Sequence, residues 1–165
     1  MILYAPGDVW AWNVAVRYAD AGGILLDDRE RWTVRIEKGG ALAVERAFLG
    51  TMLGDGALVP SADPKPEVLK GRIEPDGTLS LKDTASDPVA ARVLRRLLNP
   101  DRGITERLAG TPLVRHAVIQ DKEAFVPGSG LPASLRVEAN LFSAHLGGKE
   151  IPLTPTPLPQ KGNHL

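Results

Sequence analysis

The first half of the chain alternates between large apolar residues and small or polar ones. Between Val9 and Tyr18, every second side chain is large and apolar, namely Trp10, Trp12, Val14, Val16 and Tyr18. A period of two places such side chains on one face of a β-strand. The alternation returns at Trp32, Val34 and Ile36, and again over residues 135–141. These segments predict strands that bury one face.

Turn signals separate the strand-like segments and predict hairpins. They are Gly22-Gly23, Lys38-Gly39-Gly40, Pro75-Asp76-Gly77 and Gly147-Gly148, where glycine tolerates the positive φ of tight turns. The five charged residues 27–31 predict a charged turn after the short apolar segment 24–26. Residues 41–48 and 114–120 fit either a strand or a helix, because periodicity alone does not separate the two there.

The middle of the chain changes to helical spacing. Asp87 suits an N-cap, Pro88 suits the first helical position, and Asn99-Pro100 ends the pattern. Between them lies one apolar stripe, Val89, Val93, Leu94, Leu97 and Leu98. A second, shorter helix is predicted from Asp101 to Ala109, followed by Gly110. We therefore expect an α+β fold, a mainly antiparallel hairpin sheet with a short two-helix insertion.

The end of the chain is rich in proline. We predict a single globular α+β domain over residues 1–151 and a disordered, flexible Pro-rich tail over residues 152–165. The string from Leu153 to Pro159 resembles the translated intergenic repeats at the ends of some bacterial reading frames, which favours a passive tail. The alternative is a proline-rich ligand for the groove of a partner.

Composition narrows the function classes. The chain has 165 residues, no cysteine, and 20 basic against 20 acidic residues. This excludes a disulfide framework, a cysteine-ligated metal site, a catalytic thiol and nucleic-acid binding through global basicity. The N-terminus does not resemble a secretory signal, and no apolar run approaches the roughly 20 residues of a membrane span, so we expect a cytoplasmic protein. A net charge of zero favours association with itself or with a partner.

Two residue sets are candidate contact surfaces. Arg92, Arg95 and Arg96 share one face of the first predicted helix, with Arg102 nearby, and suit a phosphate or an acidic partner. The alternative is a solvated helix face, which is more common. The aromatic set Trp10, Trp12, Tyr18 and Trp32 is interpreted as core rather than as a stacking platform for a base or sugar.

Local catalytic and cofactor motifs are absent from the sequence. His116, His145 and His164 lack the spacing of a zinc site, and Asp27, Asp28 and Glu30 lack the spacing of a calcium loop. Ser129 lies in Gly-Ser-Gly rather than in a nucleophile elbow, and no phosphate-binding loop occurs. No metal, cofactor or catalytic residue is therefore assigned.

One stretch, Phe125-Val-Pro-Gly-Ser-Gly-Leu-Pro-Ala-Ser-Leu-Arg136, resembles the Pro-Gly-Ser-Ser-Leu-Lys-Gly loop of the CRISPR RAMP proteins. Those proteins bind guide RNA with a ferredoxin-like fold. Here Gly130 replaces the second serine and Pro132 stands in place of the lysine. The resemblance covers about a dozen residues, so it supports RNA only as an alternative partner and does not assign the family.

Together these observations predict a non-catalytic protein-interaction module, an accessory subunit of a bacterial cytoplasmic assembly that binds another protein or itself. The first alternative is RNA binding through the arginine-bearing helix. The second is an enzyme whose carboxylates or His116 come together only in three dimensions.

Overall fold

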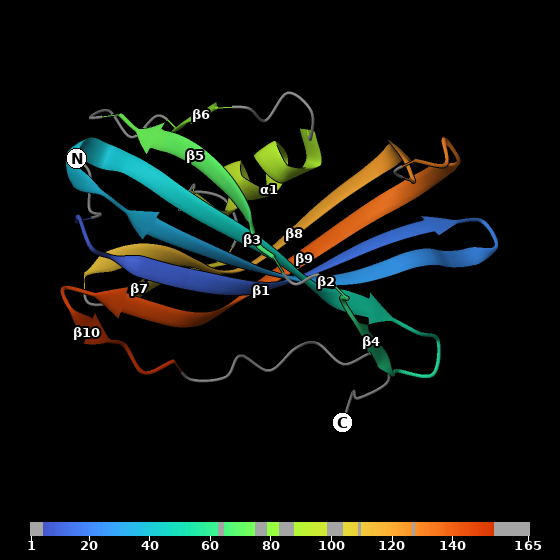
Figure 1. Cartoon of the computed structure of the whole chain (residues 1–165), viewed down its shortest axis with the longest axis horizontal. Helices are drawn as coiled ribbons and strands as arrows, with labels where there is room; N and C mark the ends of the chain where they lie inside the picture. Colours follow the sequence, from blue (N-terminus) through green and yellow to red (C-terminus); the bar gives the residue numbers. More distant parts are fainter. Residues whose placement is uncertain are drawn as a thin grey trace.

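The computed structural model describes residues 5–62, 65–74, 79–82, 88–98, 104–108, 110–126 and 128–153. Within these ranges lie ten strands, one α-helix and one short 3₁₀ helix (Figure 1). The strands are β1 (Val9–Asp20), β2 (Gly23–Ile36), β3 (Ala41–Met52), β4 (Leu58–Pro60), β5 (Glu67–Ile73), β6 (Leu79–Lys82), β7 (Ile104–Leu108), β8 (Thr111–Phe125), β9 (Pro132–Leu146) and β10 (Lys149–Glu150). The helices are η1 (Lys38–Gly40) and α1 (Pro88–Leu98).

All ten described strands belong to one antiparallel sheet that curves into a half-barrel. The strand order is β6-β5-β3-β2-β1-β9-β8-β7, with β4 paired to β3 and β10 paired to β9. The half-barrel stays open between β6 and β7, and α1 joins these two edges in the sequence. In space α1 contacts both β6 and β8 (Figure 1). Among the described residues, α1 is the one α-helix that packs on the concave side of the sheet.

The alternating pattern of β1 divides the sheet into two faces. Trp10, Trp12 and Trp32 point to the inner face, where they are at most 1% exposed. They share one core with the α1 side chains Ala90, Val93, Leu94, Leu97 and Leu98. Burial of each large side chain contributes on the order of 2–3 kcal/mol. The outer face carries the intervening residues of β1, such as Asn13, Ala15 and Arg17.

The Asp8 side chain links the start of β1 to the turn after β9 through hydrogen bonds. Its carboxylate is buried, with Oδ2 accepting a hydrogen bond from the Ala5 N–H at 2.9 Å and Oδ1 accepting one from the Gly147 N–H at 3.1 Å. Gly147 and Gly148 have φ of 62° and 79°, which suits the two-residue turn between β9 and β10. The start of β1 is thereby held against the end of β9.

Several elements confirm the predictions. The sheet is mainly antiparallel, and β1 and the first helix lie where the patterns indicate. Residues 41–48 and 114–120, for which the sequence left strand and helix open, are strands. Asp87, the Pro75-Asp76-Gly77 turn and residues 154–165 of the predicted tail lie outside the described residues. Ile151 and Leu153, at the predicted boundary of the tail, pack against the core.

Two local predictions are wrong. The second helix of the insertion is replaced by β7, whose backbone pairs with β8 from Ile104 opposite His116 to Leu108 opposite Thr111. The β-branched residues Ile104 and Thr105 favour the strand, and the available partner edge decides the outcome. The charged turn over residues 27–31 is instead the middle of β2, where successive charges go to opposite faces and find partners there.

The stretch that resembles the RAMP loop forms the end of β8, a turn and the start of β9. A ferredoxin-like fold has a β-α-β-β-α-β order. Here, within the described residues, one α-helix follows six strands of a single half-barrel sheet. The fold that the resemblance implies is therefore absent from this part of the chain. Nor does any described helix have the length and apolar character needed to cross a membrane.

Candidate binding surfaces

Three hairpin connections lie at the same end of the sheet, spread apart from one another (Figure 1). They are the β1–β2, β3–β4 and β8–β9 connections, and the pairing of Ala19 with Ser134 and of Asp28 with Thr51 places them at the same end (Figure 1). Seven exposed large apolar side chains, which we call the apolar tips, lie on or beside these connections: Ile24, Leu25, Leu53, Leu58, Val59, Phe125 and Leu131. They are 41–63% exposed, so no described part of the chain covers them.

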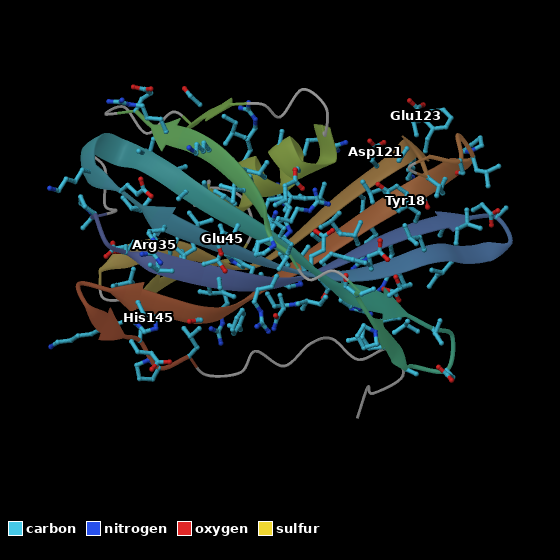
Figure 2. All side chains as sticks on the ribbon, in the orientation of Figure 1. Tyr18, Arg35, Glu45, Asp121, Glu123 and His145 are labelled. Carbon is cyan, nitrogen blue, oxygen red and sulfur yellow. The ribbon has the colours of Figure 1, made fainter. Side chains whose placement is uncertain are left out.

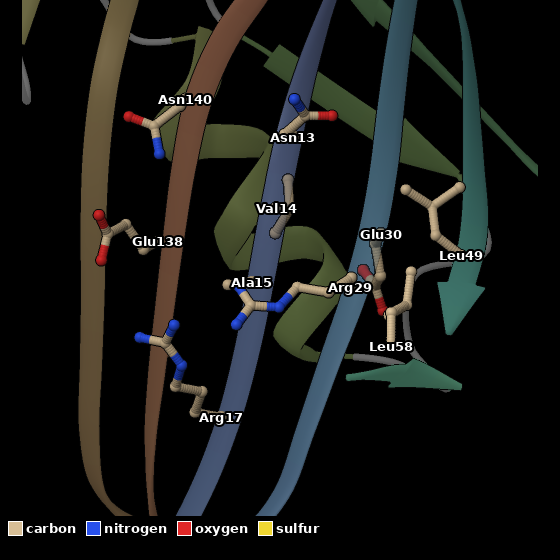
Figure 3. Close-up of a pocket in the computed structure, with 10 residues that line it drawn as sticks. All are labelled: Asn13, Val14, Ala15, Arg17, Arg29, Glu30, Leu49, Leu58, Glu138 and Asn140. Carbon is tan, nitrogen blue, oxygen red and sulfur yellow. The ribbon is translucent and has the colours of Figure 1, made fainter. Parts of the chain in front are cut away.

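A hollow of about 480 Å³ lies on the sheet at β1, β2 and β9, and we call it the outer hollow (Figure 3). Ala15 lies at its centre, opposite Arg29 of β2 and Glu138 of β9. The short Ala15 side chain leaves room above β1, and Arg29 reaches across this strand toward it (Figure 3). Leu49 and Leu58 form the apolar wall on the β3 side.

Asp27 forms ion pairs with two arginines of the outer hollow. Its Oδ1 atom lies 3.5 Å from Arg17 Nε and 3.2 Å from Arg29 Nη2. The two arginine side chains keep about a third of their exposure, 32% and 29%. One carboxylate shared by two guanidinium groups leaves an excess of positive charge at this point.

The opposite wall combines amides with a histidine–carboxylate pair. Asn13 and Asn140 are direct neighbours across β1 and β9, and His116 lies next to Asn140 on β8. His116 Nε2 lies 3.2 Å from Glu138 Oε1, with both side chains mostly buried. Arg136 Nη2 lies 3.8 Å from Glu138 Oε2. The wall therefore offers both hydrogen-bond donors and acceptors.

A second hollow of about 640 Å³ continues toward the apolar tips and shares Arg17 with the outer hollow. It is lined by Ala19, Ile24, Gln120, Asp121, Lys122, Ser134, Leu135 and Arg136 as well. Its lining is largely apolar, and Ser134 Oγ donates a hydrogen bond to the Ala19 carbonyl oxygen at 3.1 Å. The two hollows form a continuous surface from the middle of β1 to its end.

Sequence reasoning missed a polar network on the inner face. Glu30 Oε1 accepts hydrogen bonds from Trp32 Nε1 and from Arg46 Nε, each at 2.9 Å, and Arg46 Nη2 lies 2.9 Å from Glu30 Oε2. The Arg46 guanidinium also lies 5.2 Å from the centre of the Trp32 ring. The network is satisfied internally and mostly buried, so we assign it a structural role.

Asp28 lies beyond this network on the same face. Burial is the main cause that raises the pKa of its carboxyl above the ordinary 3.8, and the neighbouring charges of Glu30 and Asp27 raise it further. The hydrogen bond from the Thr51 hydroxyl, 2.9 Å long, acts in the opposite direction. The raised pKa follows from the fold and does not by itself indicate a site.

The three described arginines of the set that the sequence groups together have different surroundings on α1. Arg92 Nη1 lies 2.6 Å from Asp121 Oδ2 of β8, so its charge is already paired. Arg95 is exposed and Arg96 is partly buried. Arg102 lies outside the described residues. Arg92 and Arg95 are thus the two members of this set that the structure exposes.

The aromatic set lies in the core. Trp10, Trp12 and Trp32 are at most 1% exposed and Tyr18 is 5% exposed. Trp10 and Trp12 meet edge to face with ring centres 6.3 Å apart, and Trp12 Nε1 donates to the Val114 carbonyl oxygen at 2.8 Å. These side chains stabilise the half-barrel and are closed to a stacking ligand.

Among the described residues, no group of three or more histidine, aspartate or glutamate side chains could hold a metal ion. His145 is exposed at the end of the sheet away from Tyr18 and Asp121 (Figure 2), and His164 lies outside the described residues. Ser129 caps its own turn by donating to the Val126 carbonyl oxygen at 3.0 Å. The serine and histidine candidates therefore do not meet.

Comparison of the chain with protein-family models, with curated proteins and with solved structures gives no match.

Proposed function

We propose that this protein is a non-catalytic protein-interaction module that docks through the apolar tips. The observation that carries the proposal is the concentration of exposed apolar side chains at one end of the sheet. Ten exposed large hydrophobic residues occur in the described ranges, and seven of them are the apolar tips. Single exposed apolar residues are ordinary, whereas seven at one end of a sheet favour an interaction surface.

The partner that we propose is a second copy of this chain. The formal net charge is zero, so two copies do not repel each other at long range. Within residues 23–25, 53–59 and 125–131, Asp55 is the one charged residue. Depletion of charge is characteristic of the centre of an interface. A two-fold arrangement would bury the tips of one copy against those of the other.

Light scattering coupled to size-exclusion chromatography tests this proposal. We expect a mass near twice the 17.7 kDa of one chain for the unaltered protein. The double variant Phe125→Ser/Leu131→Ser should elute as a monomer, because both side chains are more than half exposed and make no essential core contact. Val68→Ser is the matched control, since Val68 is 58% exposed but lies on β5. A monomeric unaltered protein, or equal loss of mass in the control, would count against self-association.

The alternative function is RNA binding by α1, which rests on the exposed side chains of Arg92 and Arg95. A phosphate-directed contact weakens as salt increases. Absorbance at 260 nm in the protein peak at low salt, lost after a high-salt wash and absent in an Arg92/Arg95/Arg96 triple alanine variant, would support it. Absence of bound nucleic acid at low salt removes this alternative.

A further inference from the structure

The outer hollow has the size of a small-molecule site. It shares Leu58 with the apolar tips, but it does not include Phe125 or Leu131, the two side chains changed in the docking test. Its volume of about 480 Å³ falls within the roughly 300–1,000 Å³ that small-molecule sites occupy. It is formed by three neighbouring strands and by the β3–β4 hairpin, so its shape belongs to the sheet itself. Gly50 supports this wall because a Cβ there would overlap the Val59 carbonyl oxygen beside Leu58.

The charges around the outer hollow favour an anion. The charged residues that line the hollow are Arg17, Arg29, Glu30 and Glu138. The Glu30 carboxylate is already paired with Arg46 on the inner face. Asp27 lies beside the hollow and contacts Arg17 and Arg29, and Arg136 lies beside Glu138. Arg136 offsets the charge of Glu138, so the single carboxylate of Asp27 faces the two guanidinium groups of Arg17 and Arg29, which leaves a positive excess. The planar guanidinium group binds carboxylate and phosphoryl oxygens through two parallel hydrogen bonds.

The neutral groups of the same hollow favour hydroxyls. Asn13 and Asn140 occupy paired positions of β1 and β9 and both line the hollow, and each amide offers both a donor and an acceptor. Arg31 Nη2 lies 3.5 Å from Asn13 Oδ1, which directs the amide nitrogen of Asn13 away from Arg31. Leu49 and Leu58 provide an apolar wall for the C–H face of a ligand. A simple inorganic anion would use none of these groups.

We infer that the outer hollow binds a small anionic polyol, a molecule with hydroxyl groups and one carboxylate or phosphoryl group. Arg17 and Arg29 hold the anionic group. Asn13 and Asn140 hold the hydroxyls, and the leucine wall contacts the carbon skeleton. The chemistry shared by sugar acids and sugar phosphates meets all three requirements.

Isothermal titration of the full chain separates the possible ligands. The probes are D-glucuronate, D-glucose 6-phosphate, D-glucose, acetate and inorganic phosphate. We expect at least one of the two anionic sugars to bind at least tenfold more tightly than glucose, acetate or phosphate. The tighter of the two distinguishes a carboxylate from a phosphoryl ligand. Absence of binding by both anionic sugars at millimolar concentration, or equal binding by glucose or by the simple anions, overturns the inference.

Variants assign the binding to the outer hollow. The double variant Arg17→Gln/Arg29→Gln should lose at least tenfold in affinity for the anionic sugar. Arg35→Gln should stay within twofold, because Arg35 is exposed on β2 far from the hollow (Figure 2). If the double variant unfolds, Asn140→Asp serves instead, since it keeps the shape of the side chain, removes its amide donor and adds a negative charge to the hollow. Equal affinity in the unaltered protein and in the hollow variants overturns the inference.

Discussion

Glu30 and Arg46 form a two-point ion pair on the inner face, with Nε–Oε1 and Nη2–Oε2 distances of 2.9 Å. The side chains keep only 7% and 17% of their exposure. Removal of one partner leaves a mostly buried charge without compensation. The ion pair compensates the buried charge of Glu30, so this member of the charged segment 27–31 can lie on the inner face of β2.

Replacement of Arg46 by alanine should therefore lower the free energy of unfolding by about 3 kcal/mol, the lower end for a broken buried pair because Arg46 retains some exposure. Urea denaturation measures this change. The double variant Glu30→Gln/Arg46→Leu removes both charges, keeps an oxygen acceptor for Trp32 Nε1 and should recover most of the loss. If the double variant is less stable than Arg46→Ala, the ion pair contributes more than this explanation allows.

Asp28 should make stability depend on pH in an unusual direction. Because burial raises the pKa of its carboxyl above 3.8, the folded protein binds this proton more tightly than the unfolded chain does. Ionisation of Asp28 therefore lowers stability above the folded-state pKa, and this loss disappears as the pH falls toward 3.8. Asp28→Asn keeps an acceptor for the Thr51 hydroxyl and removes the charge.

We expect Asp28→Asn to be more stable than the unaltered protein near neutral pH, with a difference that shrinks as the pH approaches the carboxyl range. Urea denaturation of both proteins, near neutral pH and again at a pH close to 3.8, measures this difference in the free energy of unfolding. Thr51→Val should lower the free energy of unfolding near neutral pH, since it removes the hydrogen bond that lowers the pKa of Asp28. A difference between Asp28→Asn and the unaltered protein that is the same at both pH values is the contradictory result.

Gly50 should be required for the β3–β4 hairpin. Its φ is 150°, and a Cβ would overlap the Val59 carbonyl oxygen, so Gly50→Ala must push β4 away from β3. We expect a loss of about 1–3 kcal/mol in unfolding free energy. Gly54→Ala is the control, because a Cβ at Gly54 meets nothing within 4 Å. Equal stability of the two alanine variants would show that β4 moves freely.

Arg92 should contribute only part of the acidity of Asp121. The main cause that lowers the pKa of Asp121 is the 3.0 Å hydrogen bond that the backbone N–H of Glu123 donates to Asp121 Oδ1. The second cause is the hydrogen bond from the Arg92 side chain. Arg92→Gln should therefore raise the pKa of Asp121 while leaving it below 3.8. A carboxyl titration followed by NMR measures this. A return of the Asp121 pKa to its ordinary value would contradict the ranking of the two hydrogen bonds.

The sequence predicted the elements whose pattern is local. β1 and α1 each bury one face against the core. A strand that does so repeats its apolar residues with a period of two and a helix with a period of 3.6, so both patterns can be found in the sequence. Residues 27–31 were predicted wrongly because five charges resemble a turn, whereas Asp27 contacts Arg17 and Glu30 contacts Arg46 on opposite faces. Residues 104–108 become a strand because β8 offers an edge, which no local pattern shows.

The candidate surfaces depend on pairing that the sequence does not display. Asn13, Arg29 and Asn140 each look like ordinary outward residues of separate strands, and only the register brings them together. The apolar tips belong to three hairpins that are far apart in the chain. Their short exposed apolar segments beside turn signals were visible, but nothing in the sequence indicated that the tips share one end of the sheet.

Hydrogen exchange of the backbone amides, followed at low and at high protein concentration, tests the docking proposal most directly. If two copies meet through the apolar tips, protection should increase with concentration in residues 20–25, 53–59 and 128–131, and should stay constant along β6 and β7. Phe125→Ser/Leu131→Ser should abolish the increase. Constant protection at the tips, or an increase confined to the edge strands β6 and β7, would contradict the proposal.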